Sequence, residues 1–256
     1  MDTETTQATA VEVKAEPVEA ETIQRVHQSA PARMTRFSGI IPPKALMRAN
    51  VAVIGTGAVG RQAALQLAQI GVEEMTLVDL DEVSGENLGP QGWFEDEIGL
   101  KKVDALKGMV ERINPSLSLE VHNVAFEPDH IEDADWVFCC VDNMEVRKQV
   151  FDAASENMIR LFAEARMGAE SCEAHFVYDD ASREAWNERW FPQAEAAPET
   201  CTTRATSHCS SLAATLLVTG FTKMLRKHPV PQVIRANLQS FQMEFEGMPE
   251  GEKEDW

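Results

Sequence analysis

The stretch Val51-Ala52-Val53-Ile54-Gly55-Thr56-Gly57-Ala58-Val59-Gly60 decides the fold, because an apolar run of strand length leads through three glycines into a helical pattern. Gly55 permits the tight turn, Gly57 lets backbone N–H groups approach a phosphate, and Gly60 lets the helix pack closely on the strand. The amino terminus of the helix then faces an anion. The stretch therefore predicts a phosphate-binding loop.

A second predicted strand, Met75–Val78, ends in Asp79, 19 residues after Gly60. A carboxylate at this spacing accepts hydrogen bonds from ribose hydroxyls, so the bound group is predicted to be a nucleotide. The competing interpretation is a glycine turn that binds nothing. The loop and its acid do not by themselves distinguish NAD from ATP.

Strand-length apolar runs alternate with helical stretches over the first half of the chain, which is typical of βαβ units and a parallel sheet. We expect a Rossmann-like, doubly wound α/β fold. The predicted strands are Val51–Ile54, Met75–Val78, Leu117–Val121, Trp136–Val141 and Leu161–Ala163. The predicted helices are Ala58–Ile70, Ile98–Ile113 and Met144–Asn157.

The second half has a different pattern. A strand at Ala174–Tyr178 precedes a polar, acidic stretch, Asp179–Thr200, which we interpret as a long crossover loop with Trp186 and Trp190 as its apolar anchors. A helix is expected over Ser207–Lys227 and a late strand region over Val233–Phe245. The sheet is therefore expected to be mostly parallel, with a later antiparallel portion.

Composition limits the classes of function. The chain has 256 residues, 44% hydrophobic and 25% charged, as expected for a globular protein. The net charge of -19 disfavours binding to nucleic acid or to an anionic membrane surface. About half of this charge is terminal. We predict a disordered acidic arm over 1–32, one domain over 33–246 divided into a nucleotide half (50–166) and a carrier-binding half (167–246), and an acidic tail over 247–256.

Five cysteines form an odd set without a CxxC pair, no secretory leader is apparent, and no apolar stretch approaches 18 residues. We therefore expect reduced thiols, a cytoplasmic location and no membrane span. Cys139 and Cys140 lie in an apolar run, so at least one should be buried. His208 and Cys209 are adjacent on a helix and would not face each other, so packing or capping is expected for both.

Several motifs together are more specific than the glycine loop. They are Val51–Gly60, Leu77-Val78-Asp79-Leu80-Asp81, Asn87-Leu88 with Gln91, Ile98-Gly99-Leu100-Lys101-Lys102-Val103, Asn114-Pro115 and Cys140-Val141-Asp142-Asn143. In this combination the chain resembles the ThiF/MoeB/HesA family of adenylating enzymes over roughly residues 33–227. The resemblance implies ATP- and magnesium-dependent adenylation of the C-terminal glycine of a small β-grasp protein, with release of pyrophosphate.

The resemblance also implies roles for individual residues. Lys102 would contact the phosphates, Asp142 would hold Mg²⁺ or orient ATP, and Asp79 would bind the ribose. Asn87 and Gln91 would line the nucleotide pocket, which would also include Asp81. The competing interpretations are a solvated helix lysine for Lys102, a turn acid for Asp142, and an ordinary polar loop for Asn87 and Gln91.

Two features at the edge of the motif set bear on activity. Arg33-Met34-Thr35-Arg36 resembles a family Arg-x-x-Arg segment that reaches across a dimer into the neighbouring site, which makes Arg36 a candidate catalytic residue; a surface arginine is the alternative. Pro90 stands where the family carries an arginine, and proline offers neither charge nor N–H donor. Either another cation, Arg61 or Lys101, compensates, or the ATP chemistry is weakened.

Cys201-Thr202-Thr203-Arg204 resembles the stretch that carries the thioester cysteine of ubiquitin-activating relatives. A helix amino terminus and Arg204 nearby would lower the pKa of the Cys201 thiol. An ordinary loop thiol is the alternative. Many family members bind zinc through paired CxxC motifs, which this sequence lacks, so no structural zinc is expected.

The resemblance thus implies an activating enzyme for a ubiquitin-like or sulfur-carrier protein, working as a homodimer, with a conjugating enzyme or a sulfurtransferase as a further partner. Two alternatives remain open from the sequence. One is a non-catalytic subunit of a heterodimeric activating enzyme, and the other is an NAD-dependent oxidoreductase.

Overall fold

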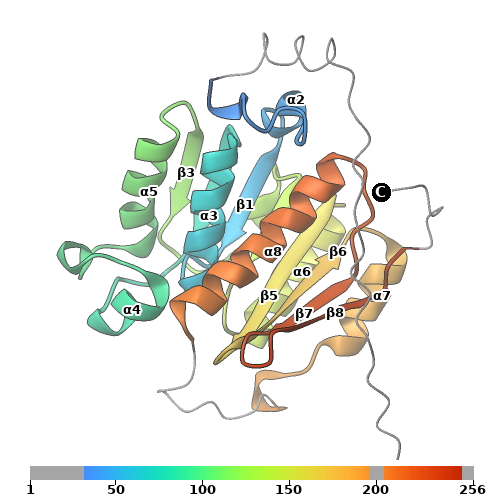
Figure 1. Cartoon of the computed structure of the whole chain (residues 1–256). Helices are drawn as coiled ribbons and strands as arrows, with labels where there is room; N and C mark the ends of the chain where they lie inside the picture. Colours follow the sequence, from blue (N-terminus) through green and yellow to red (C-terminus); the bar gives the residue numbers. More distant parts are fainter. Residues whose placement is uncertain (1–31, 196–204, 250–256) are drawn as a thin grey trace, which may run out of the picture.

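A computed structural model describes residues 32–195 and 205–249. The predicted arm falls almost wholly outside the described residues, as does most of the predicted acidic tail. The described part forms three layers, in which a single sheet lies between two layers of helices (Figure 1).

The sheet has eight strands in the order β3-β2-β1-β4-β5-β6-β7-β8. The first five in this order pair in parallel, and the last three join as antiparallel neighbours. The strands are β1 Asn50–Ile54, β2 Glu74–Val78, β3 Ser118–His122, β4 Trp136–Cys139, β5 Leu161–Gly168, β6 Ser171–Val177, β7 Val233–Asn237 and β8 Gln242–Glu246. This order confirms the doubly wound, mostly parallel fold with a later antiparallel portion.

Helices cover both faces of the parallel part of the sheet, as its apolar strands require. Of the described helices, α3, α5 and α8 pack on one face, and α6 and α7 pack on the other. The longer helices are α3 Ala58–Ile70, α5 Lys102–Ile113, α6 Met144–Glu156, α7 Asp180–Arg189 and α8 Ser207–Leu225. Shorter ones are η1 Ala32–Met34, α2 Pro43–Leu46, η2 Gly85–Asn87, α4 Leu88–Gln91, η3 Glu95–Glu97, η4 Pro128–Ile131 and η5 Gln193–Glu195.

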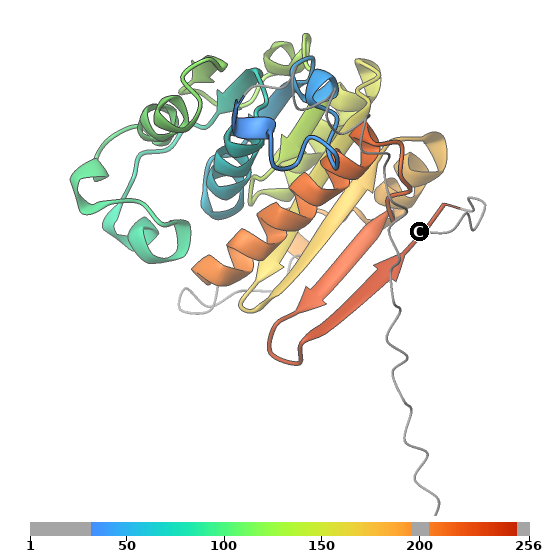
Figure 2. The same cartoon turned by 45° about the horizontal axis from the view of Figure 1, so that its top comes forward.

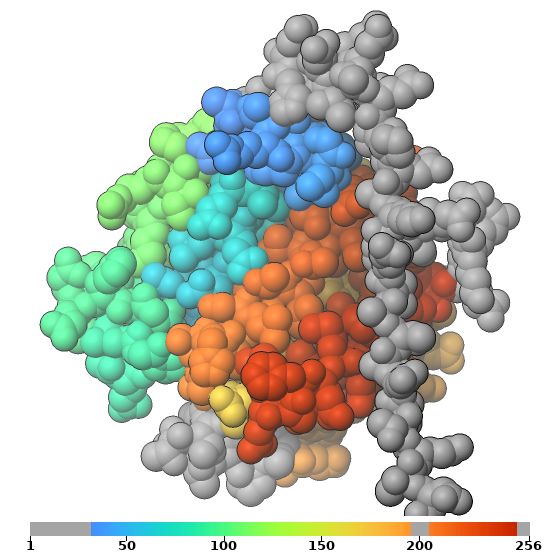
Figure 3. Space-filling view, in the orientation of Figure 1, coloured from blue at the N-terminus to red at the C-terminus, as the bar shows by residue number. Residues whose placement is uncertain are grey.

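Helix α8 runs diagonally over β5 and β6 and lies against α3 (Figure 2). In the space-filling view the surfaces of α3 and α8 meet without a gap between them (Figure 3). The Phe221 ring packs edge-on against Trp136 and Phe138, with centroids 4.9 and 5.9 Å away. Helix α8 therefore ties the late part of the chain to the first βαβ unit.

One predicted helix starts later than expected, and one predicted loop contains a helix. The predicted helix Ile98–Ile113 begins only at Lys102, because Gly99 has a φ of 87° and a bridge pairs Glu82 with Lys101. The predicted loop Asp179–Thr200 begins with helix α7 instead. The Asp179 carboxylate accepts from the Ser182 N–H at 2.7 Å, a capping interaction that starts the helix despite its weak apolar period.

Strands β7 and β8 form a hairpin at the far edge of the sheet (Figure 2). Arg235 on β7 binds Glu246 on β8 at 2.7 Å and Glu173 on β6 at 3.0 Å. All five β8 residues are exposed. The predicted late strand region Val233–Phe245 is therefore two strands.

Candidate functional site

The glycine loop follows β1 at the point where the strand order reverses, with β2 on one side of β1 and β4 on the other. Gly55 has a φ of 87°, and a Cβ there would lie 2.9 Å from the backbone of Cys140, just after β4. A Cβ on Gly60 would lie 1.8 Å from the Gly55 carbonyl oxygen. Both positions therefore require glycine, and the loop occupies the crevice where this class of fold binds ligands.

Asp79 lies at the end of β2 and joins the glycine loop directly. Its Oδ2 accepts from Thr56 N at 2.6 Å and from Thr56 Oγ1 at 3.0 Å, and its Oδ1 accepts from Asp81 N at 2.9 Å. Thr56 is completely buried. Asp79, the residue predicted to bind the ribose, is thus fixed against the loop because its carboxylate accepts two hydrogen bonds from Thr56.

Gln91 lies over the second glycine of the loop. Its amide nitrogen would be 3.8 Å from a Cβ placed on Gly57, and its Oε1 accepts from Trp93 Nε1 at 2.8 Å. Asn87 has a local role as well, because its Oδ1 accepts from Ser84 N at 3.3 Å. Gln91 therefore lies against the glycine loop, whereas the Asn87 side chain forms its hydrogen bond within its own turn.

Lys102 is the first residue of α5 and is only 6% exposed. Its ammonium group lies 2.7 Å from Asp81 Oδ2, and its backbone N–H donates to the Asp81 carbonyl at 3.0 Å. The neighbouring Lys101 pairs with Glu82 at 2.8 Å in a more exposed position. The solvated-lysine interpretation of Lys102 is therefore wrong.

Asp142 follows β4 and is exposed, and its carboxylate has no hydrogen bond or ion pair with other described residues. The next residue, Asn143, caps α6 by accepting from Val146 N at 3.0 Å. Asp142 therefore lies at the carboxyl end of β4, the strand that pairs with β1 and whose following residue walls the glycine loop.

The structure does not bring Arg36 to this group. Its segment packs at the carboxyl end of α3, where Arg33 donates to the carbonyls of Ala68 at 3.3 Å and Ile113 at 3.0 Å. The glycine loop lies at the opposite end of α3, which spans 13 residues, or about 20 Å at the rise of a helix. Arg36 itself is exposed. Cys201 lies outside the described residues.

Sequence reasoning missed a buried charge cluster beside β4. Glu164 on β5 is fully buried and binds Arg147 of α6 at 3.3 Å and Arg166 at 2.7 Å. Although burial alone would raise the pKa of Glu164, Arg147, His175 and Arg166 hold it below its usual value. The sequence alone does not indicate this cluster. Only the strand register, which places Glu164 beside Cys139, brings its members together.

The described cysteines are free thiols. Burial raises the pKa of Cys139 to about 12 and raises that of Cys140 further. Cys139 is completely buried, which confirms the prediction for that pair. Cys172 and Cys209 are also buried, and a hydrogen bond between them raises the pKa of Cys172 and lowers that of Cys209.

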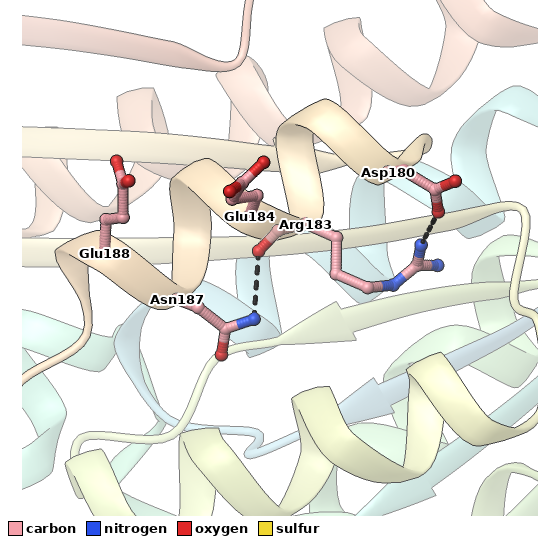
Figure 4. Close-up of a pocket in the computed structure, with 5 residues that line it drawn as sticks. All are labelled: Asp180, Arg183, Glu184, Asn187 and Glu188. Carbon is pink, nitrogen blue, oxygen red and sulfur yellow. Dashed lines mark hydrogen bonds and ion pairs between the residues drawn. The ribbon is translucent and has the colours of Figure 1, made fainter.

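A surface hollow lies along α7 (Figure 4). Within it, Arg183 pairs with Asp180 at 2.8 Å, and the Asn187 amide donates to the Arg183 carbonyl at 3.1 Å. Its lining residues are Asp180, Arg183, Glu184, Asn187 and Glu188. None of them was predicted as a site residue.

In the described ranges, no group of three or more His, Cys, Asp or Glu side chains is placed to hold a metal ion on its own. Among the same residues, none of the helices has the length and apolar character to cross a bilayer.

Comparison with known proteins identifies the family. Residues 33–255 match the ThiF family. The chain belongs to the ThiF family. The match covers the glycine loop and all the residues gathered around it.

Named ThiF-like relatives include two kinds of enzyme. The molybdopterin-synthase adenylyltransferase of Haemophilus influenzae is 30% identical over 139 residues, covering 52% of this chain and 57% of that protein. The ubiquitin-like modifier-activating enzyme 5 of Caenorhabditis elegans is 26% identical over 187 residues, covering 67% of this chain and 44% of that protein. The chain thus spans about half the length of these relatives. They do not favour a non-catalytic subunit or an oxidoreductase.

Solved structures share the fold of the described chain. The crystal structure of E. coli MccB with AMPCPP and MccA superposes with a TM-score of 0.69 at 16% identity, covering 89% of this chain and 76% of that one. The crystal structure of PaaA superposes with a TM-score of 0.67 at 18% identity, covering 91% and 85%.

Proposed function

We propose that the chain uses ATP to adenylate the C-terminal glycine carboxylate of a ubiquitin-like or sulfur-carrier protein. The observation that supports the proposal is the glycine loop itself: Asp79 is bonded to Thr56 of the loop, Gln91 lies over Gly57, and Asp81, two residues beyond Asp79, binds Lys102. The names of the relatives, an adenylyltransferase and a modifier-activating enzyme, point to the same reaction.

The residues fit a nucleoside triphosphate. Of the three glycines in the loop, Gly57 alone could carry a Cβ without a clash, since its nearest neighbour would be the Gln91 amide nitrogen at 3.8 Å. We propose that backbone N–H groups at this position bind phosphate. Asp79 would accept from the ribose, and Lys102, held by Asp81, would contact the phosphates. Asn87 would line the pocket beside Gln91. Together these residues would provide acceptors for ribose hydroxyls and donors for phosphate oxygens, as a nucleotide requires.

Asp142 would hold a magnesium ion together with the triphosphate. Carboxylate oxygens are the ligands Mg²⁺ prefers, and Mg²⁺ is commonly bound by one or two carboxylates plus substrate phosphates, so a cluster of three acids is not required. When bound, the ion would offset negative charge on the phosphates. We propose no structural zinc.

The reaction joins two anions. The carboxylate oxygen of the carrier attacks the α-phosphorus of ATP, the bond from that phosphorus to the bridging oxygen breaks, and pyrophosphate leaves with the electron pair. The products are the acyl adenylate and pyrophosphate. Lys102 would neutralise charge that develops on the phosphates during this step.

We propose that Cys201 performs a second step. Its thiolate would attack the acyl carbonyl carbon, form a thioester and release AMP, after which a conjugating enzyme or a sulfurtransferase would take the carrier onward. Such chemistry requires a reduced thiol, so we place the protein in the cytoplasm, and the free thiols of the described cysteines accord with this.

We further propose a homodimer in which Arg36 enters the site of the neighbouring subunit. Arg36 is exposed, and its segment packs at the end of α3 remote from the glycine loop of its own chain. Arg36 therefore does not reach the glycine loop of its own chain, and we propose that it acts on the loop of a partner subunit. We also propose that residues 50–166 bind the nucleotide and that residues 167–246 bind the carrier protein.

The test is ATP–pyrophosphate exchange with a β-grasp carrier that ends in glycine. The wild type should catalyse exchange only with the intact carboxyl terminus, and Asp142→Ala and Lys102→Ala should each lower the rate by about 10²–10³-fold. Lys107→Ala, on the exposed surface of the same helix, is the matched control. Exchange that survives both substitutions would contradict the proposed site.

The thioester is tested separately. Carrier bound through a bond that reductant cleaves should appear with the wild type and be absent from Cys201→Ala, which should still catalyse exchange. A thioester that forms in Cys201→Ala would eliminate this cysteine.

A further inference from the structure

Arg61 follows Gly60 in the first turn of α3 and is only 6% exposed. Its Nη2 lies 3.2 Å from the Met109 sulfur, and its guanidinium carbon lies 5.0 Å from the centre of the Trp93 ring. The Nε atom is buried and has no hydrogen-bond partner. Burying a guanidinium N–H group without a hydrogen-bond acceptor costs free energy, and a bound acceptor would offset this cost.

No described carboxylate forms an ion pair with Arg61, although most buried charges in proteins are paired. Two other buried cations of the described ranges differ from Arg61, since Arg147 binds Glu164 at 3.3 Å and Lys102 binds Asp81 at 2.7 Å. Burial lowers the pKa of Arg61, and Glu97, beyond contact distance, only partly offsets this. The positive charge of Arg61 therefore remains largely uncompensated by the described chain.

The guanidinium lies beside the segment that covers the glycine loop. A Cβ on Gly92 would be 3.2 Å from Arg61 Nη1, and Gly92 follows Gln91 directly. Trp93 stacks on Arg61 and donates to Gln91, whose amide lies over Gly57. Arg61 and Gln91 are thus joined through one indole ring, at the amino-terminal end of α3, where the helix dipole favours an anion.

We propose that Arg61 is a counter-charge for the polyphosphate part of the nucleotide, an inference that rests on the proposed function. Its five N–H donors in a planar fork suit phosphate oxygens. Of the two cations considered as substitutes for the arginine absent at Pro90, Lys101 is paired with Glu82, whereas Arg61 has no carboxylate partner among the described residues. The ligand is expected to carry a di- or triphosphate. A single phosphate group would be bound by the N–H groups of the loop, so Arg61 would contact a further phosphate group.

The experiment is calorimetric titration of the full chain with ATP, ADP, AMP and inorganic pyrophosphate. Arg61→Gln and Arg61→Met remove the charge, Arg61→Lys keeps it, and Arg112→Gln is the control on the exposed face of α5. Losing hydrogen bonds to a charged group corresponds to a loss of about 10- to 100-fold in affinity for ATP, ADP and pyrophosphate. Affinity for AMP should change by less than about threefold, and Arg61→Lys should retain most of the ATP affinity.

A structural role for Arg61 would give a different pattern. The inference would be overturned if the neutral variants lost equal affinity for AMP and for ATP. It would also be overturned if both neutral variants unfolded at a much lower urea concentration than wild type. If wild type binds ATP and the neutral variants bind it equally well, only the role of Arg61 fails. If wild type binds pyrophosphate through Arg61 but not ATP, the charge assignment stands and the proposed adenylation fails.

Discussion

Lys102 Nζ lies 2.7 Å from Asp81 Oδ2, and this bond joins the start of α5 to the turn after β2. The lysine is buried, whereas the Asp81 side chain is 56% exposed. The pair therefore holds a cation in place near the glycine loop while its partner still faces solvent.

Lys102→Met should separate binding from folding. The substitution keeps the buried stem, so the free energy of unfolding should change by no more than about 1 kcal/mol. ATP should no longer raise the melting temperature, because the proposed contact of Lys102 with the phosphates would be lost. Thermal melts with and without ATP measure both effects. Lys107→Met should behave as wild type, and a Lys102→Met protein still stabilised by ATP would refute the assignment.

Gly60→Ala and Gly57→Ala form a matched pair within one loop. At Gly60 the new methyl would meet the Gly55 carbonyl oxygen at 1.8 Å, so unfolding should become easier by about 2–4 kcal/mol. At Gly57 nothing lies nearer than 3.8 Å, so stability should fall by no more than about 1 kcal/mol while ATP affinity falls. Urea titration and calorimetry distinguish them. Equal destabilisation by both would contradict the loop geometry.

Glu173 predicts a pH-dependent contribution to stability. Hydrogen bonding to His175, with Arg235 nearby, lowers the pKa of Glu173 from 4.5 to about 2 against an opposing effect of burial. Because the folded pKa is depressed, the stabilisation is present above pH 4.5 and is lost as the pH falls towards 2. Glu173 is more than a third exposed, so screening reduces the gain to about 1–2 kcal/mol.

Glu173→Gln should therefore be less stable than wild type by that amount at pH 7, and nearly equal to it at pH 2. Urea denaturation across this range measures the difference. Glu188→Gln, exposed on α7, should follow the wild type throughout. A deficit in Glu173→Gln that does not change with pH would show that the carboxylate charge is not the cause.

Trp186 anchors α7 on the sheet. The side chain is 1% exposed and stacks on Phe151 with ring centroids 3.8 Å apart. Trp186→Ala should cost about 3–5 kcal/mol in unfolding free energy, against less than about 0.5 kcal/mol for Val124→Ala at an exposed position. Chemical denaturation followed by circular dichroism tests this. A cost below 1 kcal/mol would mean that α7 is not held by this contact.

The sequence was sufficient for the elements whose cause is local. The glycine loop and α3 follow from short-range rules, and α3 has the predicted bounds Ala58–Ile70. Helix α7 was missed because its residues lack a strong apolar period, and only the Asp179 cap marks its start. A cap is a weaker signal than a periodic apolar stripe.

The candidate site was predicted in its parts rather than in its contacts. Asp79 and Lys102 could be named from motifs, but the Asp79–Thr56 and Lys102–Asp81 bonds depend on tertiary packing. The stacking of Arg61 on Trp93 joins residues 32 positions apart and leaves no periodic trace in the sequence. Such pairings follow only when the strand order is known.

The close approach of Gly55 to Cys140 has a consequence for protein synthesis. The turn after β1 is short and local, yet it packs against Cys140, a residue just after β4 that the ribosome adds 85 residues later. Contacts between distant parts of a chain form slowly and only after both parts exist. A growing chain therefore carries an incomplete cradle until β4 has emerged and docked, which delays any ligand capture by the nascent polypeptide.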